Sequence, residues 1–125
     1  MSFLQRLQRS QSLIIDSWKN LTDHDQLDVI DSTSFDYPVI IFKHSTTCGI
    51  SASAKFRLER DWSMIERQLE FYYLDLLKFR GISNVIAERY EVRHESPQIL
   101  VIKEGRILHH SSHYQVSIPS LKEYI

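Results

Sequence analysis

The most constraining feature of the sequence is an apolar run that leads directly into the only cysteine. Val39-Ile40-Ile41-Phe42 is rich in β-branched residues without polar interruption, which is typical of a strand buried on both faces. A helix is expected from about Thr47 to about Asp61, with Thr46 or Thr47 as its cap. Its apolar residues recur every four positions, at Ile50, Ala54 and Leu58. Cys48 therefore lies where a buried strand turns into a helix.

The rest of the chain contains patterns for three more helices and three more strands. The helices are expected over about 22–32, 83–90 and 119–125, and the strands over 71–74, 97–102 and 106–109. Thr22 and Asp25 form a capping signature for the first of these helices, and Ser83 can cap the second after a break at Gly81. Glu104-Gly105 is a turn signal that joins the last two strands into a hairpin.

This order of elements predicts an α/β protein with a thioredoxin-like fold. We expect a mixed, four-stranded central sheet flanked by helices, in which the first two strands are parallel neighbours and the hairpin is antiparallel. The length of 125 residues fits a single domain. Within it, residues 1–36 are expected to form an N-terminal extension and residues 37–125 the thioredoxin-like core.

Charge and composition argue against several classes of partner. The formal net charge is −1 and the basic residues are scattered, so neither nucleic acid nor a membrane is an expected partner. The aromatic run 71–73 is flanked by Glu70 and Asp75, which favours core packing over base stacking. The N-terminal residues do not resemble a signal peptide, and no stretch is long enough to span a membrane. One cysteine allows no intramolecular disulfide, so a reducing cytoplasm is the expected location.

The position of Cys48 favours a reactive thiol. Unpaired N–H groups and the dipole at a helix start stabilise the thiolate, and can lower a cysteine pKa to roughly 3.5–7.5 from about 8.5. A dithiol enzyme would carry its second cysteine at Ser51, whose hydroxyl can hydrogen-bond a thiolate but cannot resolve a mixed disulfide. Cys48 must then rely on an outside thiol. The alternative is a buried, inert cysteine that packs as a small apolar residue.

Other polar residues near these elements have weaker signals. Ser96-Pro97 precedes a strand; a cis peptide there would expose backbone for substrate binding, whereas an ordinary trans proline would only begin the strand. His44 could support the thiolate or could be structural, and His94 is expected to fix its loop. Lys43 alternates to the other face and is expected either to be solvated or to extend its ammonium group to the surface along apolar neighbours.

A metal site is not expected. The candidate ligands would be His109, His110 and His113, but neighbouring residues on a strand point to opposite faces and no second cysteine motif is present. No bound cofactor is expected.

Several of these segments together resemble a known family. Residues 42–51, FKHSTTCGIS, with His94-Glu95-Ser96-Pro97-Gln98 and Ser111-Ser112-His113, are similar to the YtxJ-like family of bacillithiol-system proteins, the monothiol bacilliredoxins. The resemblance extends from near Trp18 to the end of the chain. It implies a thioredoxin-like fold and removal of bacillithiol from S-bacillithiolated proteins through a mixed disulfide on Cys48.

Two classes of function follow from these observations. In the first, the chain is a monothiol thiol–disulfide oxidoreductase, with S-thiolated proteins as clients and a low-molecular-weight thiol, bacillithiol or an analogue, as co-substrate. Cys48 and Ser51 would be catalytic, and Thr47, Gly49, Ser96 and Pro97 would bind the substrate. In the second, the chain is a non-catalytic binding module or a redox sensor. A peroxide- or arsenate-linked reductase is a weaker third interpretation, and the sequence contains no recognisable oxyanion site for it.

Overall fold

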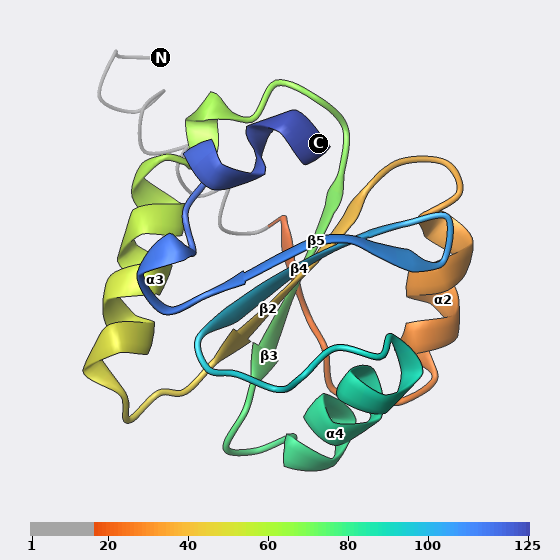
Figure 1. Cartoon of the computed structure of the whole chain (residues 1–125), viewed down its shortest axis with the longest axis horizontal. Helices are drawn as coiled ribbons and strands as arrows, with labels where there is room; N and C mark the ends of the chain where they lie inside the picture. Colours follow the sequence, from red (N-terminus) through yellow and green to blue (C-terminus); the bar gives the residue numbers. More distant parts are fainter. Residues whose placement is uncertain (1–16) are drawn as a thin grey trace, which may run out of the picture.

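The expected alternation of strands and helices is present in the structure, a computed structural model that describes residues 17–125 (Figure 1). The strands are β1 (Trp18–Asn20), β2 (Val39–His44), β3 (Glu70–Asp75), β4 (Gln98–Lys103) and β5 (Arg106–Ser112). The α-helices are α2 (Gln26–Thr33), α3 (Gly49–Arg60) and α4 (Arg80–Arg89). Short 3₁₀ helices follow at η1 (Trp62–Met64), η2 (His113–Gln115) and η3 (Pro119–Tyr124).

The strands form one mixed sheet in the order β1-β3-β2-β4-β5. β2 lies at its centre, parallel to β3 and antiparallel to β4, as predicted. β4 and β5 form the predicted hairpin, and Gly105 adopts a φ of +73° in its turn, a left-handed conformation that suits glycine. The thioredoxin-like α/β architecture expected from the sequence is therefore observed.

The sheet has five strands, whereas four were predicted. The additional strand is β1, which lies in the segment assigned to an N-terminal extension and pairs in parallel with β3. Trp18 stacks on Phe71 with ring centroids 4.3 Å apart and meets Trp62 edge-on at 5.5 Å. Residues 17–36 thus supply both an edge strand and helix α2. Residues 1–16 of the predicted extension lie outside the described residues.

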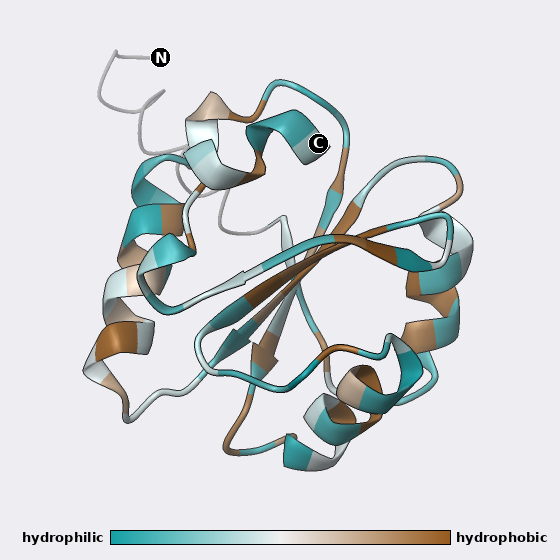
Figure 2. Cartoon of the chain, in the orientation of Figure 1, coloured by the Kyte–Doolittle hydropathy of each residue, from teal (hydrophilic) through white to brown (hydrophobic). Residues whose placement is uncertain are grey.

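The sheet is covered on both faces, and the side chains of β2 contribute to the apolar cluster on each face. Its side chains alternate, so Val39 and Ile41 belong to one apolar cluster while Ile40 and Phe42 belong to the other. Helices α2 and α4 complete the first cluster, and α3 with η1 and η3 completes the second. Figure 2 shows the strongly hydrophobic colour running along the central strands between these helices. A strand buried on both faces is what the unbroken apolar run predicted.

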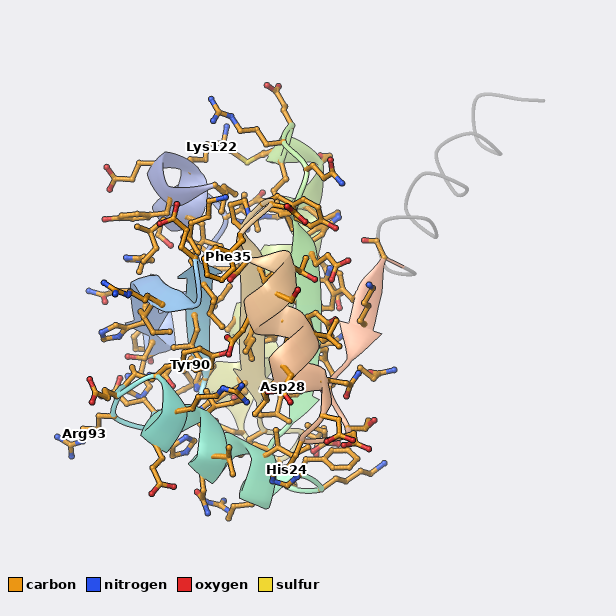
Figure 3. All side chains as sticks on the ribbon, turned by 90° about the vertical axis from the view of Figure 1, so that its right-hand side faces the viewer. His24, Asp28, Phe35, Tyr90, Arg93 and Lys122 are labelled. Carbon is orange, nitrogen blue, oxygen red and sulfur yellow. The ribbon has the colours of Figure 1, made fainter. Side chains whose placement is uncertain are left out.

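Polar contacts join α2 to α4 on the outside of the first cluster (Figure 3). Arg89 at the end of α4 makes ion pairs with Asp28 and Asp31 of α2. The Tyr90 hydroxyl donates a hydrogen bond to Asp31, and burial, followed by this bond, raises the pKa of Tyr90. These contacts fix α4, whose first turn lies at the same end of the sheet as the carboxyl ends of β2 and β3.

The predicted helix caps were wrong in detail. Helix α2 begins only at Gln26, whose side-chain oxygen accepts the N–H groups of Thr22 (2.8 Å) and Asp23 (3.0 Å). The side chain of Gln26 therefore accepts the N–H groups before the helix, in place of the expected cap from Thr22 and Asp25. Ser83 lies inside α4, two residues after Gly81, and does not start it. The last predicted helix is 3₁₀ in form.

Helix α3 begins at Gly49, and Cys48 itself is its N-cap residue. Neither Thr46 nor Thr47 caps the helix, contrary to expectation, and the Cys48 sulfur lies beside the first-turn N–H groups without a fully formed capping hydrogen bond. Ile50 is exposed, while Ser51 joins Ala54 and Leu58 on the buried side. The predicted buried face of the helix was therefore right at Ala54 and Leu58 but wrong at Ile50, which lies on the solvent side.

Candidate active site

Cys48 is held at the entrance of α3 by backbone hydrogen bonds on both sides. Its N–H donates to the carbonyl of Ser45 at 3.2 Å, and its carbonyl accepts from Ala52 at 3.0 Å in the first helical bond. Its own backbone is extended, with φ −107° and ψ 124°, as an N-cap residue requires. The thiol is half-buried. The residue is therefore partly exposed to solvent.

The first turn of α3 stabilises the thiolate of Cys48. The backbone N–H of Ser51 makes the largest contribution to lowering its pKa, followed by the backbone N–H of Ile50. Burial opposes these two contributions, and the hydroxyl of Ser51, which lowers the pKa further, has the smallest effect of all. These are the unpaired N–H groups that every helix start offers. The nucleophile is thus prepared mainly by the backbone of the first turn.

Ser51 has a second contact that ties the loop to the helix. Its side chain is buried, and its hydroxyl oxygen accepts the N–H of Ser45 at 3.3 Å. Thr47 and Gly49, on either side of the cysteine, are exposed. A Cβ built on Gly49 would meet no atom within 4 Å outside its chain neighbours, so there is open space at this position. The predicted assignments of Thr47 and Gly49 to substrate binding stay predictions.

Of the two alternatives for the Ser96–Pro97 peptide bond, the structure has the cis form, and Pro97 is buried. The register pairs Lys43 at the end of β2 with Gln98 at the start of β4. Because these strands are antiparallel, the loop that ends in Pro97 and the loop that carries Cys48 lie at the same end of the sheet (Figure 1). His113 closes this end further by donating its N–H to the carbonyl of Pro97 at 3.0 Å.

His44 has a partner other than the thiol. Its Nδ1 is joined to the Tyr73 hydroxyl by a hydrogen bond of 2.6 Å, and only 6% of the residue is exposed. Burial, followed by the charge of Lys55, lowers its pKa and favours the neutral ring. His44 also lines an open groove of about 430 Å³ beside α3, together with Thr46, Ala52, Lys55, Phe56, Glu59 and Tyr73. This geometry favours the structural interpretation at the strand end.

Lys43 is fully buried, so the expectation of a solvated lysine was wrong. Its Nζ donates to the carbonyl of Ser83 and to Nδ1 of His94, each at 3.3 Å. Burial lowers its pKa to about 8. His94 also has the Ser83 hydroxyl 3.2 Å from the same Nδ1, and burial is the main cause that lowers the pKa of His94. His94 is therefore attached to two other elements, which agrees with a role in fixing its loop.

The histidines of β5 do not gather around a common point. His109 stacks on Tyr124 with ring centroids 4.2 Å apart, whereas His110 is exposed. Among residues 17–125, no group of three or more His, Cys, Asp or Glu side chains could hold a metal ion. Within the same range, no helix combines the length and apolarity needed to cross a membrane.

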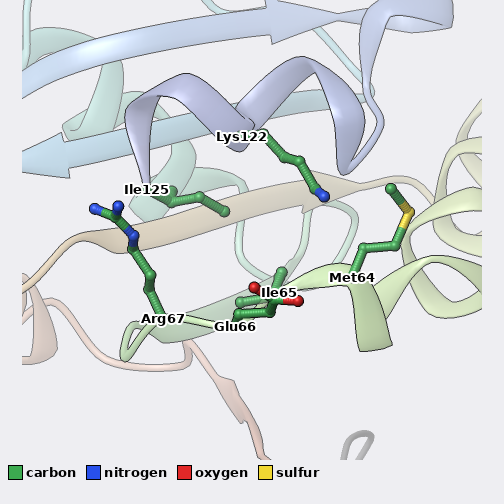
Figure 4. A pocket seen from close by; sticks show the side chains of 6 residues that line it. All are labelled: Met64, Ile65, Glu66, Arg67, Lys122 and Ile125. Atoms are coloured by element: carbon green, nitrogen blue, oxygen red, sulfur yellow. The ribbon is translucent and has the colours of Figure 1, made fainter.

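A small pocket of about 120 Å³ lies elsewhere, between the segment that follows α3 and the C-terminal residues (Figure 4). Its walls are Met64, Ile65, Glu66, Arg67, Lys122 and Ile125. The 12 residues of α3 separate this pocket from Cys48, and a helix of that length spans about 18 Å. The pocket is therefore not part of the thiol site.

The comparisons with known proteins agree with this geometry. A family described as monothiol bacilliredoxin BrxC matches residues 19–121. The chain belongs to the monothiol bacilliredoxin family. A solved structure assigned as an oxidoreductase with a thioredoxin fold is similar to this bacilliredoxin at 30% identity and a TM-score of 0.75, covering 88% of this chain and 95% of that one.

Two thioredoxins share the fold of this bacilliredoxin at lower identity. One is thioredoxin f from spinach chloroplast in its long form, with 15% identity, a TM-score of 0.66, and coverage of 94% of this chain and 90% of that one. The other is the Malassezia sympodialis thioredoxin Mala s 13, with 18% identity, a TM-score of 0.65 and 85% coverage of each chain. Family and fold together make this bacilliredoxin a thiol–disulfide oxidoreductase with a thiol redox role.

Proposed function

We propose that the chain removes a low-molecular-weight thiol from protein mixed disulfides by monothiol exchange at Cys48. The thiolate of Cys48 attacks the small thiol's sulfur in a protein–S–S–R disulfide. The bond between that sulfur and the client breaks, and the client cysteine leaves as a thiolate that takes a proton from water. Cys48 then carries the small thiol as a mixed disulfide, with no net oxidation or reduction in this step.

A second exchange regenerates the enzyme. The thiolate of another small thiol molecule attacks the small-thiol sulfur bound to Cys48, which releases Cys48 as a thiolate and forms the small thiol's symmetrical disulfide. A dithiol reductase could replace that molecule. Either way the electrons come from outside the chain, because its sequence contains only one cysteine.

The observation that carries the proposal is the combination of a prepared thiolate with serine at the resolving position. The backbone of the first turn lowers the pKa of Cys48, and Ser51 occupies the place where a dithiol enzyme has its second cysteine. Family membership supports bacillithiol, or an analogue of it, as the small thiol. A reducing cytoplasm is the compartment in which such exchange is useful.

The client and small thiol would approach through the exposed end of the sheet. Thr47 and Gly49 are exposed on either side of Cys48, and the backbone before Pro97 could pair with an extended client segment as an added strand. Ser96 has a buried hydroxyl without a hydrogen-bond partner among the described residues. This hydroxyl is therefore available to hydrogen-bond a client next to this backbone. These are the proposed roles of the four substrate-binding residues.

The test is turnover on defined mixed disulfides. A client protein carrying bacillithiol, glutathione or coenzyme A on one cysteine is incubated with the enzyme, and client thiol release is followed with mass spectrometry of Cys48. We expect release from the bacillithiol form to be fastest, with an equimolar bacillithiol adduct on Cys48. Absence of release from all three forms, in protein whose Cys48 is reduced, would contradict the proposal and leave the binding-module interpretation.

A further inference from the structure

Lys43 is a buried cation without a counter-charge among the residues that the structure describes. Its exposed fraction is 0%, and none of the ion pairs within residues 17–125 includes it. Its hydrogen-bond partners are a backbone carbonyl and an imidazole nitrogen, both uncharged acceptors. Burying an ammonium group without an anion is costly, and an apolar side chain of similar length would fill the same space. The charge at this position therefore calls for an explanation beyond packing.

The contacts of Lys43 connect three separate parts of the fold. Lys43 lies on β2, one residue before its end, Ser83 lies on α4, and His94 lies in the loop that precedes β4. A hydroxyl from Ser83 approaches the same imidazole nitrogen, so the three side chains form one cluster. The structure thus attaches this loop to the strand that leads to Cys48.

The same loop is held at a second point by its neighbour on the sheet. Gln98, which the register places directly opposite Lys43, donates a hydrogen bond from Nε2 to the carbonyl of Arg93 at 2.9 Å. Both Gln98 and Lys43 are almost completely buried. Residues 93–97 are therefore held by two buried side chains of the sheet, through Arg93 and His94 near the start of the segment.

We propose that Lys43 is a positioning residue of the exchange reaction, and that its ammonium group holds the 93–97 loop in the shape that receives a protein mixed disulfide. The inference rests on the proposed function, since it assigns the loop to client binding. Lys43 does not touch the reacting sulfur atoms. It acts through His94, which must present Nδ1 as an acceptor and so carries its proton on Nε2.

The decisive variant is Lys43→Met, which keeps the length of the side chain and removes the donor. We expect the KM for a protein mixed disulfide to rise about tenfold or more, because charge-assisted hydrogen bonds to the loop are lost. The rate of Cys48 alkylation by iodoacetamide, a small reagent that needs no docking, should stay within about twofold of wild type. Lys103→Met, a lysine at the other end of the same sheet, is the matched control and should change neither quantity.

A second pair of variants changes His94, the loop residue of the same cluster. His94→Leu removes the acceptor and should reproduce the rise in KM. His94→Asn places an amide oxygen near the position of Nδ1 and should restore most of the lost affinity. An unchanged KM in both Lys43→Met and His94→Leu would overturn the inference, as would an equal loss of alkylation and exchange, which would indicate general misfolding.

Amide hydrogen exchange keeps the inference separate from the proposed function. If the wild-type protein shows no turnover, the proposed function fails. The effect of Lys43 on the 93–97 loop can still be measured directly. We expect amides of residues 93–96 to exchange about tenfold faster in Lys43→Met than in wild type, with β2 and β3 unchanged. Equal exchange of this loop in the two proteins would overturn the inference whatever the activity.

Discussion

Replacing Cys48 with serine is expected to reduce client release to the uncatalysed rate. A serine hydroxyl is not ionised at neutral pH, and the backbone donors that stabilise a thiolate cannot supply a nucleophile of comparable strength. Serine is a favoured N-cap residue, so the variant should fold and be as stable as wild type or slightly more stable. The loss would therefore report chemistry. Client thiol release and thermal unfolding, measured on the same preparation, provide the check.

Ser53→Ala is a suitable companion for this experiment because Ser53 is exposed on the same helix and should leave the rate unchanged. Residual turnover in Cys48→Ser above the uncatalysed rate would mean that another group carries the exchange. With one cysteine in the sequence, that result would remove the basis of the monothiol mechanism.

Replacing Lys43 with methionine is expected to stabilise the protein at pH 7, by up to about 3.5 kcal/mol. The pKa of Lys43 falls from its ordinary value of 10.5 to about 8, a difference of about 2.5, and each unit is worth about 1.4 kcal/mol. This free energy is the penalty of burying the ammonium. Methionine also loses the hydrogen bonds that Lys43 donates to Ser83 and His94, so the net gain in stability is smaller than this penalty. Urea unfolding of both proteins gives the difference directly.

The pH dependence of this effect has a definite sign. Between pH 8 and 10.5 the unfolded chain keeps the Lys43 proton while the folded chain has lost it, so Lys43 makes stability rise with pH in this window. Methionine has no such dependence. The advantage of Lys43→Met should therefore be greatest below pH 8 and disappear near pH 10.5. A variant that is less stable than wild type at pH 7 would contradict the description of Lys43 as an uncompensated buried charge.

The two consequences of Lys43→Met point in opposite directions. The variant is expected to be more stable and also poorer at capturing a protein substrate. Such opposition is common where a functional site keeps a group that the fold alone would not favour. A residue that served only packing would not separate stability from client binding in this way.

The central part of the fold was predictable because its signals are local. The β-branched run 39–42 identified a strand buried on both faces, and Glu104-Gly105 identified the hairpin turn. Strand β1 was missed because its three residues have no periodic pattern of their own. What makes it a strand is pairing with β3 and the stacking of Trp18 on Phe71, and both depend on residues about 50 positions away.

In the candidate site, too, features set by local sequence were predictable and features set by distant residues were not. The position of Cys48 follows from the strand and helix on either side of it, so the sequence was sufficient to place it at a helix start. The burial of Lys43 depends on Ser83 and His94, which are 40 and 51 residues away. A lysine at the end of an apolar strand is normally expected to reach solvent, and only the packing of α4 and the 93–97 loop decides otherwise.

The most direct test of this account is the pH dependence of Cys48 alkylation by iodoacetamide in the wild-type protein, with mass spectrometry to identify the labelled residue. The backbone donors at the start of α3 predict a midpoint clearly below the free-thiol value of about 8.5. A midpoint at or above that value, or labelling that requires unfolding, would show that Cys48 is not an activated nucleophile and would contradict the proposed exchange reaction.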